Sequence, residues 1–257
     1  MTVPTILVLA DAEHVSRTAV QEFVRLARDA TVARSRFSVA LSGGSTPRRL
    51  YELVAAPPFC DQVEWPQVEF FWGDERAVAP DHPDSNFGIA NAALLAKLHI
   101  PRAHIHRMPA ERADRDAAAR EYQAEIARVL GVSPSGQPPQ FDLVLLGMGT
   151  DAHTASLFPH GAALRESTRW VVPSDAPGLA TPRLTLTPVI INRAAVVMFL
   201  VAGADKAPAV AEVLEGPTDP ERLPVQLICP TAGTVLWLLD RAAASRLVSV
   251  GAGQSAG

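Results

Sequence analysis

The chain has 257 residues, of which 48% are hydrophobic and 19% charged, with a formal net charge of −4. This length suits one large α/β domain, and the composition is that of a folded rather than a disordered protein. A weakly acidic chain without a run of lysine or arginine has no electrostatic footprint for nucleic acid or for an anionic membrane, so we expect neither as a partner.

The longest apolar stretches, residues 194–202 and 235–239, are far shorter than the roughly 20 residues of a membrane-spanning helix. No secretion signal is evident at the N-terminus, so we expect a cytoplasmic protein. Cys60 and Cys229 lie far apart without a CxxC or CxxH spacing, which predicts neither disulfides nor a zinc site. Because HExxH, Walker A and GxGxxG motifs are also missing from the sequence, we expect no metal and no cofactor.

Apolar, β-rich runs alternate with amphipathic helical patterns along the chain. In chain order they predict strands at 5–9, 37–41, 68–72 and 141–146, joined by helices at 12–34, from Pro47 onward, at 86–98 and at 111–130. Short strands follow near 170–172, 183–187 and 195–201, then a helix at 205–214, a strand at 234–239 and a closing helix. This alternation predicts a largely parallel sheet.

Residues 133–140 contain three prolines and a glycine, but strand and helix patterns resume on both sides, which favours a surface loop over a domain linker. We therefore expect a single domain over residues 1–250 and a flexible C-terminal tail at 251–257. The predicted fold class is α/β: an open, mostly parallel, doubly wound sheet of the Rossmann-like kind, flanked by helices, with short additional strands in the C-terminal half.

The first candidate loop lies between the strand at 37–41 and the helix that follows it. It consists of Ser42, Gly43, Gly44, Ser45 and Thr46. Their backbone N–H groups and hydroxyls can converge on an anion at the positive end of the helix dipole, which suits a phosphate. The alternative is a tight glycine turn in which Ser45 or Thr46 caps the helix.

The second loop, 72–76, follows the strand at 68–72 and brings Asp74 and Arg76 to the edge where open α/β sheets bind ligands. The guanidinium of Arg76 can form paired hydrogen bonds with phosphate oxygens. The alternative is a salt-bridged surface turn in which Asp74 only orients Arg76. Ser85 and Asn86 come next, and capping of the following helix is their expected function, although they can face the same cleft.

The third loop, 147–154, follows the buried strand at 141–146 and carries Asp151 and His153 in a glycine-rich turn. A neutral histidine there can take a proton from water, and a neighbouring carboxylate can select its tautomer and stabilise the imidazolium. The alternative is a histidine that only forms hydrogen bonds within its loop. Arg183 and Lys206 are further candidates for phosphate binding, with plain surface charge as their alternative.

These motifs resemble the 6-phosphogluconolactonase family of the glucosamine-6-phosphate isomerase/6-phosphogluconolactonase superfamily. The resemblance is carried by residues 41–47 (LSGGSTP), 72–76 (WGDER), 147–159 (GMGTDAHTASLFP), 182–185 (PRLT), 203–207 (GADKA) and 237–240 (WLLD). It covers nearly the whole chain in matching order and spacing. One departure is Ala152, where the family usually has glycine. If that position requires a positive φ, alanine costs about 1 kcal/mol, and we expect activity to survive.

The resemblance implies hydrolysis of 6-phospho-D-glucono-1,5-lactone to 6-phospho-D-gluconate in the oxidative pentose phosphate pathway, without a metal. In that reading His153 deprotonates the attacking water, with Asp151 beside it. The phosphate and the sugar hydroxyls are bound by residues 42–46, Asp74, Arg76 and Lys206, with Arg183 nearby. The only expected partner is this small phosphorylated lactone, and we expect a monomer or a weak homo-oligomer.

Two other functions are considered. A glucosamine-6-phosphate isomerase/deaminase has a similar glycine-rich turn and Asp-x-His loop, but that resemblance predicts an aromatic residue at Arg76 and IAFNEP rather than TASLFP at 154–159. A non-catalytic sugar-phosphate sensor that controls transcription usually carries a DNA-binding segment. The first strand begins by Thr5, and no basic face is evident, so this alternative is disfavoured.

Overall fold

A central parallel sheet organises the protein, whose computed structural model describes residues 3–175 and 181–248. Within these residues the sheet has six strands in the order β1-β9-β8-β5-β2-β3, and every pairing is parallel. The strands are β1 (Thr5–Leu9), β2 (Phe37–Leu41), β3 (Val68–Trp72), β5 (Leu143–Leu146), β8 (Val196–Val201) and β9 (Thr234–Asp240). The predicted α/β fold class is therefore confirmed.

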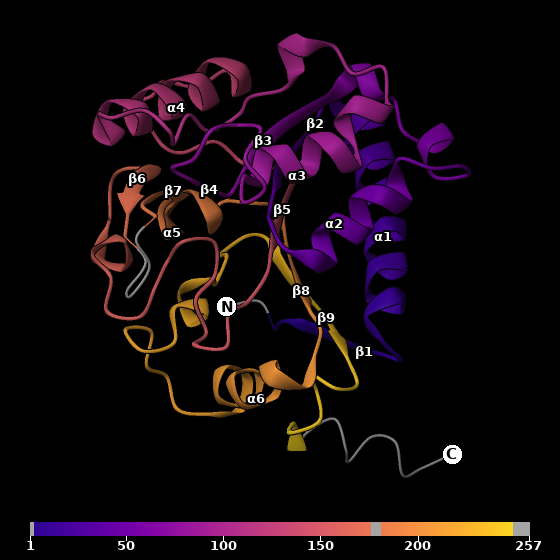
Figure 1. Ribbon diagram of the computed structural model, residues 1–257, viewed down its shortest axis with the longest axis vertical. Helices are drawn as coiled ribbons and strands as arrows, with labels where there is room; N and C mark the ends of the chain where they lie inside the picture. The colour runs from indigo at the N-terminus through magenta and orange to yellow at the C-terminus, as the bar shows by residue number, and fades with distance from the viewer. Residues whose placement is uncertain (1–2, 176–180, 249–257) are drawn as a thin grey trace.

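A small antiparallel sheet lies beside the main one, with the strand order β4-β7-β6. Its strands are β4 (Asp74–Arg76), β6 (Val171–Ser174) and β7 (Arg183–Leu186). Figure 1 shows this sheet at the left of the central strands, below α4, whereas α1 and α2 lie at the right. The short strands expected in the C-terminal half thus include two that form a separate sheet with β4.

Helices flank the sheets and are α1 (Ala12–Arg34), α2 (Ser45–Val54), α3 (Asn86–Ala93), α4 (Arg115–Leu130), α5 (Pro188–Ile191) and α6 (Ala207–Glu215). In α1 the side chain of Asp11 caps the first turn by accepting the His14 N–H at 2.9 Å. Its apolar stripe is buried, and the ring of Phe23 packs edge to face on that of Phe37 in β2, with 5.3 Å between the ring centroids. Among the described residues, no helix has both the length and the apolarity to cross a membrane.

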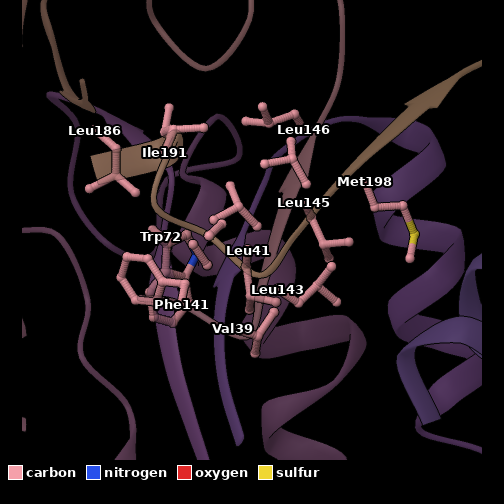
Figure 2. Close-up of a cluster of buried hydrophobic side chains, with 14 of the residues drawn as sticks. Val39, Leu41, Trp72, Phe141, Leu143, Leu145, Leu146, Leu186, Ile191 and Met198 are labelled. Carbon is pink, nitrogen blue, oxygen red and sulfur yellow. The ribbon is translucent and has the colours of Figure 1, made fainter. Parts of the chain in front are cut away.

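The core lies where β2 and β5 are covered on both faces, since every residue of these two strands is buried. Figure 2 shows part of it, in which β2 and β5 side chains gather with Trp72, Leu186 and Ile191. Each buried large apolar side chain stabilises the fold by about 1.5–3 kcal/mol. This packing makes the two strands a rigid base for the loops at their ends.

The strand order also places the site. From β2 the chain moves outward to β3, whereas from β5 it moves in the opposite direction to β8 and then β9. Such a switch point leaves a crevice at the carboxyl ends of the two strands, where open α/β sheets bind ligands. The loops after Leu41 and Leu146 therefore face each other across this crevice.

Several helices begin or end at other residues than the sequence predicts. Helix α2 begins at Ser45 rather than near Pro47, and α3 ends at Ala93 because Leu94 leaves helical geometry and a 3₁₀ turn follows. Helix α4 begins only at Arg115, since Asp114 caps it by accepting the Ala117 N–H at 2.8 Å. A 3₁₀ turn at Ala204–Lys206 likewise delays α6.

Other differences concern elements rather than ends. The strand predicted from 141 begins at Leu143, and both β4 and α5 were missed. Three residues are too few for a sequence pattern, and β4 exists only because β7 pairs with it. Turns follow β9 up to residue 246. The continuation of the predicted closing helix and the predicted tail at 251–257 lie outside the described residues.

Candidate active site

A pocket of about 360 Å³ opens at the carboxyl ends of β2 and β5. It is lined by almost all the residues selected from the sequence, namely Ser42, Gly43, Gly44, Ser45, Thr46, Asp74, Arg76, His153, Arg183 and Lys206. Asp151 is the exception, and it is joined to the pocket through His153. A larger cavity of about 590 Å³, beside α2 and α3, contains none of these residues.

The glycine-rich turn presents the N-terminus of α2 to this pocket. Gly44 occupies the N-cap position with a φ of 106°, a conformation that favours glycine, and has no side chain to cap the helix. The first N–H groups of the helix therefore remain available to an anion. The alternative of a cap by Ser45 or Thr46 is not what the structure has, because both residues lie inside α2.

A tyrosine from α2 holds the start of the same turn. The hydroxyl of Tyr51 accepts the Ser42 N–H at 3.0 Å and donates to the Ser42 carbonyl at 2.7 Å. Burial raises the pKa of Tyr51, so the phenol keeps the proton that it donates. Gly43 has no room for a side chain, since a Cβ there would lie 1.9 Å from Oδ1 of Asn86.

Strand β4 brings Arg76 opposite Arg183 of β7, and the two are direct partners across the antiparallel pair. Within the described residues neither guanidinium forms a salt bridge, and both Nε atoms are buried without a hydrogen-bond partner. Burial lowers the pKa of Arg183, as does the charge of Arg76, whereas Asp74 opposes the shift. Two adjacent cations without a paired carboxylate favour an anionic ligand.

Asp74 has a different environment from the one expected. Its carboxylate is buried, accepting the Ser156 hydroxyl at 2.6 Å and the Asn86 amide at 3.1 Å. Arg76 instead donates to the carbonyl of Asp84 at 2.5 Å. The salt-bridged turn considered from the sequence is therefore absent from this part of the described chain. Ser85 caps α3, as expected, by accepting the Gly88 N–H at 3.0 Å.

His153 and Asp151 form a hydrogen-bonded pair, with 2.6 Å between Nδ1 and the carboxylate Oδ1. The same oxygen accepts the His153 backbone N–H at 3.2 Å. Mainly because of the hydrogen bond with His153, the pKa of Asp151 is lowered to about 2. An ionised acceptor at Nδ1 selects the tautomer with its proton on that nitrogen, so Nε2 keeps a free lone pair.

The loop backbone brings this pair close to Gly149. A Cβ at Gly149 would lie 2.1 Å from Nδ1 of His153 and 2.4 Å from Oδ1 of Asp151, so a side chain there would displace the pair. The ring centroids of Phe158 and His153 lie 4.8 Å apart, and Cζ of Arg183 lies 5.8 Å from the Phe158 centroid. Phe158 thus contacts both groups, and its place in the quoted motif at 154–159 was the only sequence signal for it.

Ala152 has a φ of 61°, so the position does require a left-handed backbone. We expect Ala152→Gly to leave the free energy of unfolding unchanged or to raise it by up to about 1 kcal/mol, because relief of this strain offsets the lost methyl group. The control is Ala118→Gly at a buried position inside α4, which should lower that free energy by about 1 kcal/mol. Equal losses in urea unfolding of the two variants would contradict this account.

Lys206 reaches the pocket from the turn after β8. Gly203 begins that turn with a φ of 109°, and the carboxylate of Asp240 accepts its N–H at 3.1 Å. The ammonium of Lys206 lies 3.5 Å from the exposed Asp205 carboxylate, a contact that solvent weakens. Within the described residues, no group of three or more His, Cys, Asp or Glu side chains is placed to hold a metal ion.

The comparisons with known proteins identify the family. The sequence model of the family described as glucosamine-6-phosphate isomerases/6-phosphogluconolactonase matches residues 10–237. The chain belongs to this family. A curated relative from Synechocystis, named 6-phosphogluconolactonase, is 44% identical over 218 residues, covering 85% of this chain and 88% of the relative. A relative of the same name from Nostoc is also 44% identical, over 83% of this chain and 86% of its own length.

Solved structures of family members superpose closely. The 6-phosphogluconolactonase from Trypanosoma cruzi matches with a TM-score of 0.84 and 31% identity, covering 96% of this chain and 97% of that one. A monomeric glucosamine-6-phosphate deaminase also matches, with a TM-score of 0.78, but at 21% identity over 94% of this chain and 99% of that one. The second likeness shows the shared fold alone.

Proposed function

We propose that the protein hydrolyses 6-phospho-D-glucono-1,5-lactone to 6-phospho-D-gluconate, with His153 as the base that activates water. The observation that carries this proposal is the pairing of His153 Nδ1 with ionised Asp151, which leaves Nε2 as an acceptor in a pocket rich in cations. The relatives named 6-phosphogluconolactonase support the substrate. A lactone is already a reactive ester, so positioning matters more than strong activation.

In the proposed reaction, Nε2 takes a proton from water while the water oxygen attacks the lactone carbonyl carbon. Asp151 stabilises the resulting imidazolium, and backbone N–H groups of the surrounding loops stabilise the oxyanion. The intermediate then collapses by breaking the bond between the carbonyl carbon and the ring oxygen. The imidazolium returns its proton to that oxygen, which leaves as a hydroxyl, and the free acid ionises in solution.

The phosphoryl group and the sugar hydroxyls are held, in this proposal, by residues 42–46, Arg76, Arg183 and Lys206. The N-terminus of α2 and the buried, partnerless Nε atoms of the two guanidiniums support this assignment, because both favour an anion. Binding energy from this remote end orients the ring at His153. We further propose that the protein acts in the cytoplasm as a monomer or weak homo-oligomer and without a cofactor. Its reaction then serves the oxidative pentose phosphate pathway.

The test is to add freshly made lactone to the purified protein and follow acid release against the spontaneous reaction. Acceleration is expected with the lactone, and no ammonia release is expected from glucosamine 6-phosphate. Deamination without lactone hydrolysis would support the deaminase alternative instead. Turnover of neither substrate, with sugar phosphate still bound, would point to the sensor.

A further inference from the structure

One buried carboxylate, that of Asp74, joins the segment after His153 to the start of α3, which in turn lies against the glycine-rich turn. Among the pocket-lining residues that the structure describes, Asp74 is the only acid. It is 6% exposed, and each of its carboxylate oxygens accepts a hydrogen bond from the protein. A carboxylate with both oxygens engaged in this way is suited to holding protein groups, and it repels a phosphate.

The first donor comes from the loop that carries His153. Ser156 is fully buried, and its hydroxyl donates to Oδ2 of Asp74 at 2.6 Å. Its backbone is held as well, since its N–H donates to the Thr185 hydroxyl at 3.1 Å and its carbonyl accepts the Ser174 hydroxyl at 2.6 Å. Ser156 therefore ties the histidine loop to β4 and to the small sheet.

The second donor comes from the start of α3. The amide nitrogen of Asn86 donates to the Asp74 carbonyl at 2.9 Å and to Oδ1 of Asp74 at 3.1 Å, which fixes the orientation of the amide. Its carbonyl oxygen then lies against Gly43, in the space that a Cβ would fill. The two carboxylate oxygens of Glu75 accept the backbone N–H groups of Asn86 and Phe87, each at 2.8 Å, and so hold Asn86 in place.

We infer that Asp74 is a positioning residue, which sets the separation between His153 and the phosphate-binding turn through Ser156 on one side and Asn86 on the other. This inference rests on the proposed function and replaces the substrate contact expected for Asp74 from the sequence. An error of about 1 Å between a base and a bound substrate can lower a rate by about a hundredfold, so such a link affects turnover more than binding.

The decisive variant is Ser156→Ala, which removes one hydroxyl and no charge. We expect kcat to fall by about 10- to 100-fold while KM changes by less than about threefold, because the phosphate-binding groups stay in place. The matched control is Ser38→Ala. Ser38 lies in β2, is also buried, and its hydroxyl donates to the carboxylate of Asp142 at 2.8 Å. Both variants should lose similar stability, but only Ser156→Ala should lose kcat.

A double-mutant cycle completes the test. If Ser156 acts through Asp74, then Ser156→Ala should slow an Asp74→Asn protein far less than it slows the wild type. Additive losses in kcat, an unchanged kcat in Ser156→Ala, or an Asp74→Asn protein that changes only KM would each overturn the inference. If the wild-type protein does not accelerate lactone hydrolysis at all, the proposed function itself is wrong, and the inference fails with it.

Discussion

Replacement of His153 by alanine is expected to lower kcat for lactone hydrolysis by about 10²- to 10⁴-fold, the usual contribution of a general base. The reason is the geometry at Nδ1, where Asp151 at 2.6 Å leaves Nε2 as the free acceptor. Binding of the product should change little, because the cations and the N-terminus of α2 are untouched. Stopped-flow measurement of acid release, with calorimetric binding of 6-phosphogluconate, separates the two effects. A fully active His153→Ala protein would refute the assignment.

Asp151 provides the companion test. Its pKa is lowered from 3.8 to about 2, so it stays ionised between about pH 5 and 8. A loss of rate on acidification within that range must therefore come from a group other than Asp151. Asp151→Asn should therefore keep an acid limb in the pH–rate profile while lowering kcat, because an amide can present the wrong tautomer to Nδ1.

The lowered pKa of Asp151 also makes the stability of the fold depend on pH. A carboxyl with a lowered pKa stabilises the fold above its unfolded value of 3.8, and this contribution is lost as the pH falls toward about 2. Asp151 is half exposed, so solvent keeps the contribution small.

Replacement of Arg76 by alanine is expected to raise KM for the phosphorylated lactone by about 10- to 100-fold, the size of a lost charge-assisted hydrogen bond. Arg76 lines the pocket opposite Arg183 and forms no salt bridge within the described residues, so its charge is available to the ligand. Arg76→Lys should keep KM between those of wild type and Arg76→Ala, since an ammonium cannot form two parallel hydrogen bonds with phosphate oxygens. The measurement is the KM of each variant from initial rates.

Two controls make the Arg76 result specific. Glucono-1,5-lactone without the phosphate should be hydrolysed equally by wild type and Arg76→Ala, because in our proposal Arg76 contacts the phosphoryl group. Arg48→Ala removes the same charge from an exposed, Glu52-paired arginine outside this pocket and should change KM by less than about twofold. An equal loss on the unphosphorylated lactone would mean that Arg76 binds hydroxyls instead.

The local pattern of the chain determined a large part of this protein. Strands at 5–9, 37–41 and 68–72 and the helix at 12–34 end where the sequence predicts, because apolar periodicity and caps such as Asp11 act over a few residues. The same locality explains why Asp151 and His153, two positions apart after a buried strand, could be selected as a pair. Helix ends set by competing turns, as at Leu94, were less predictable.

Only the tertiary structure decided how the loops are joined. The hydrogen bond between Ser156 and Asp74 spans 82 positions of sequence. Arg76 lies opposite Arg183 only because the three-residue strand β4 forms against β7. No local pattern encodes such contacts, because they arise when the strand order brings distant strand ends to one edge of the sheet. The sequence alone thus determined which residue types reach the crevice, whereas the packing of the two sheets determined which of them touch.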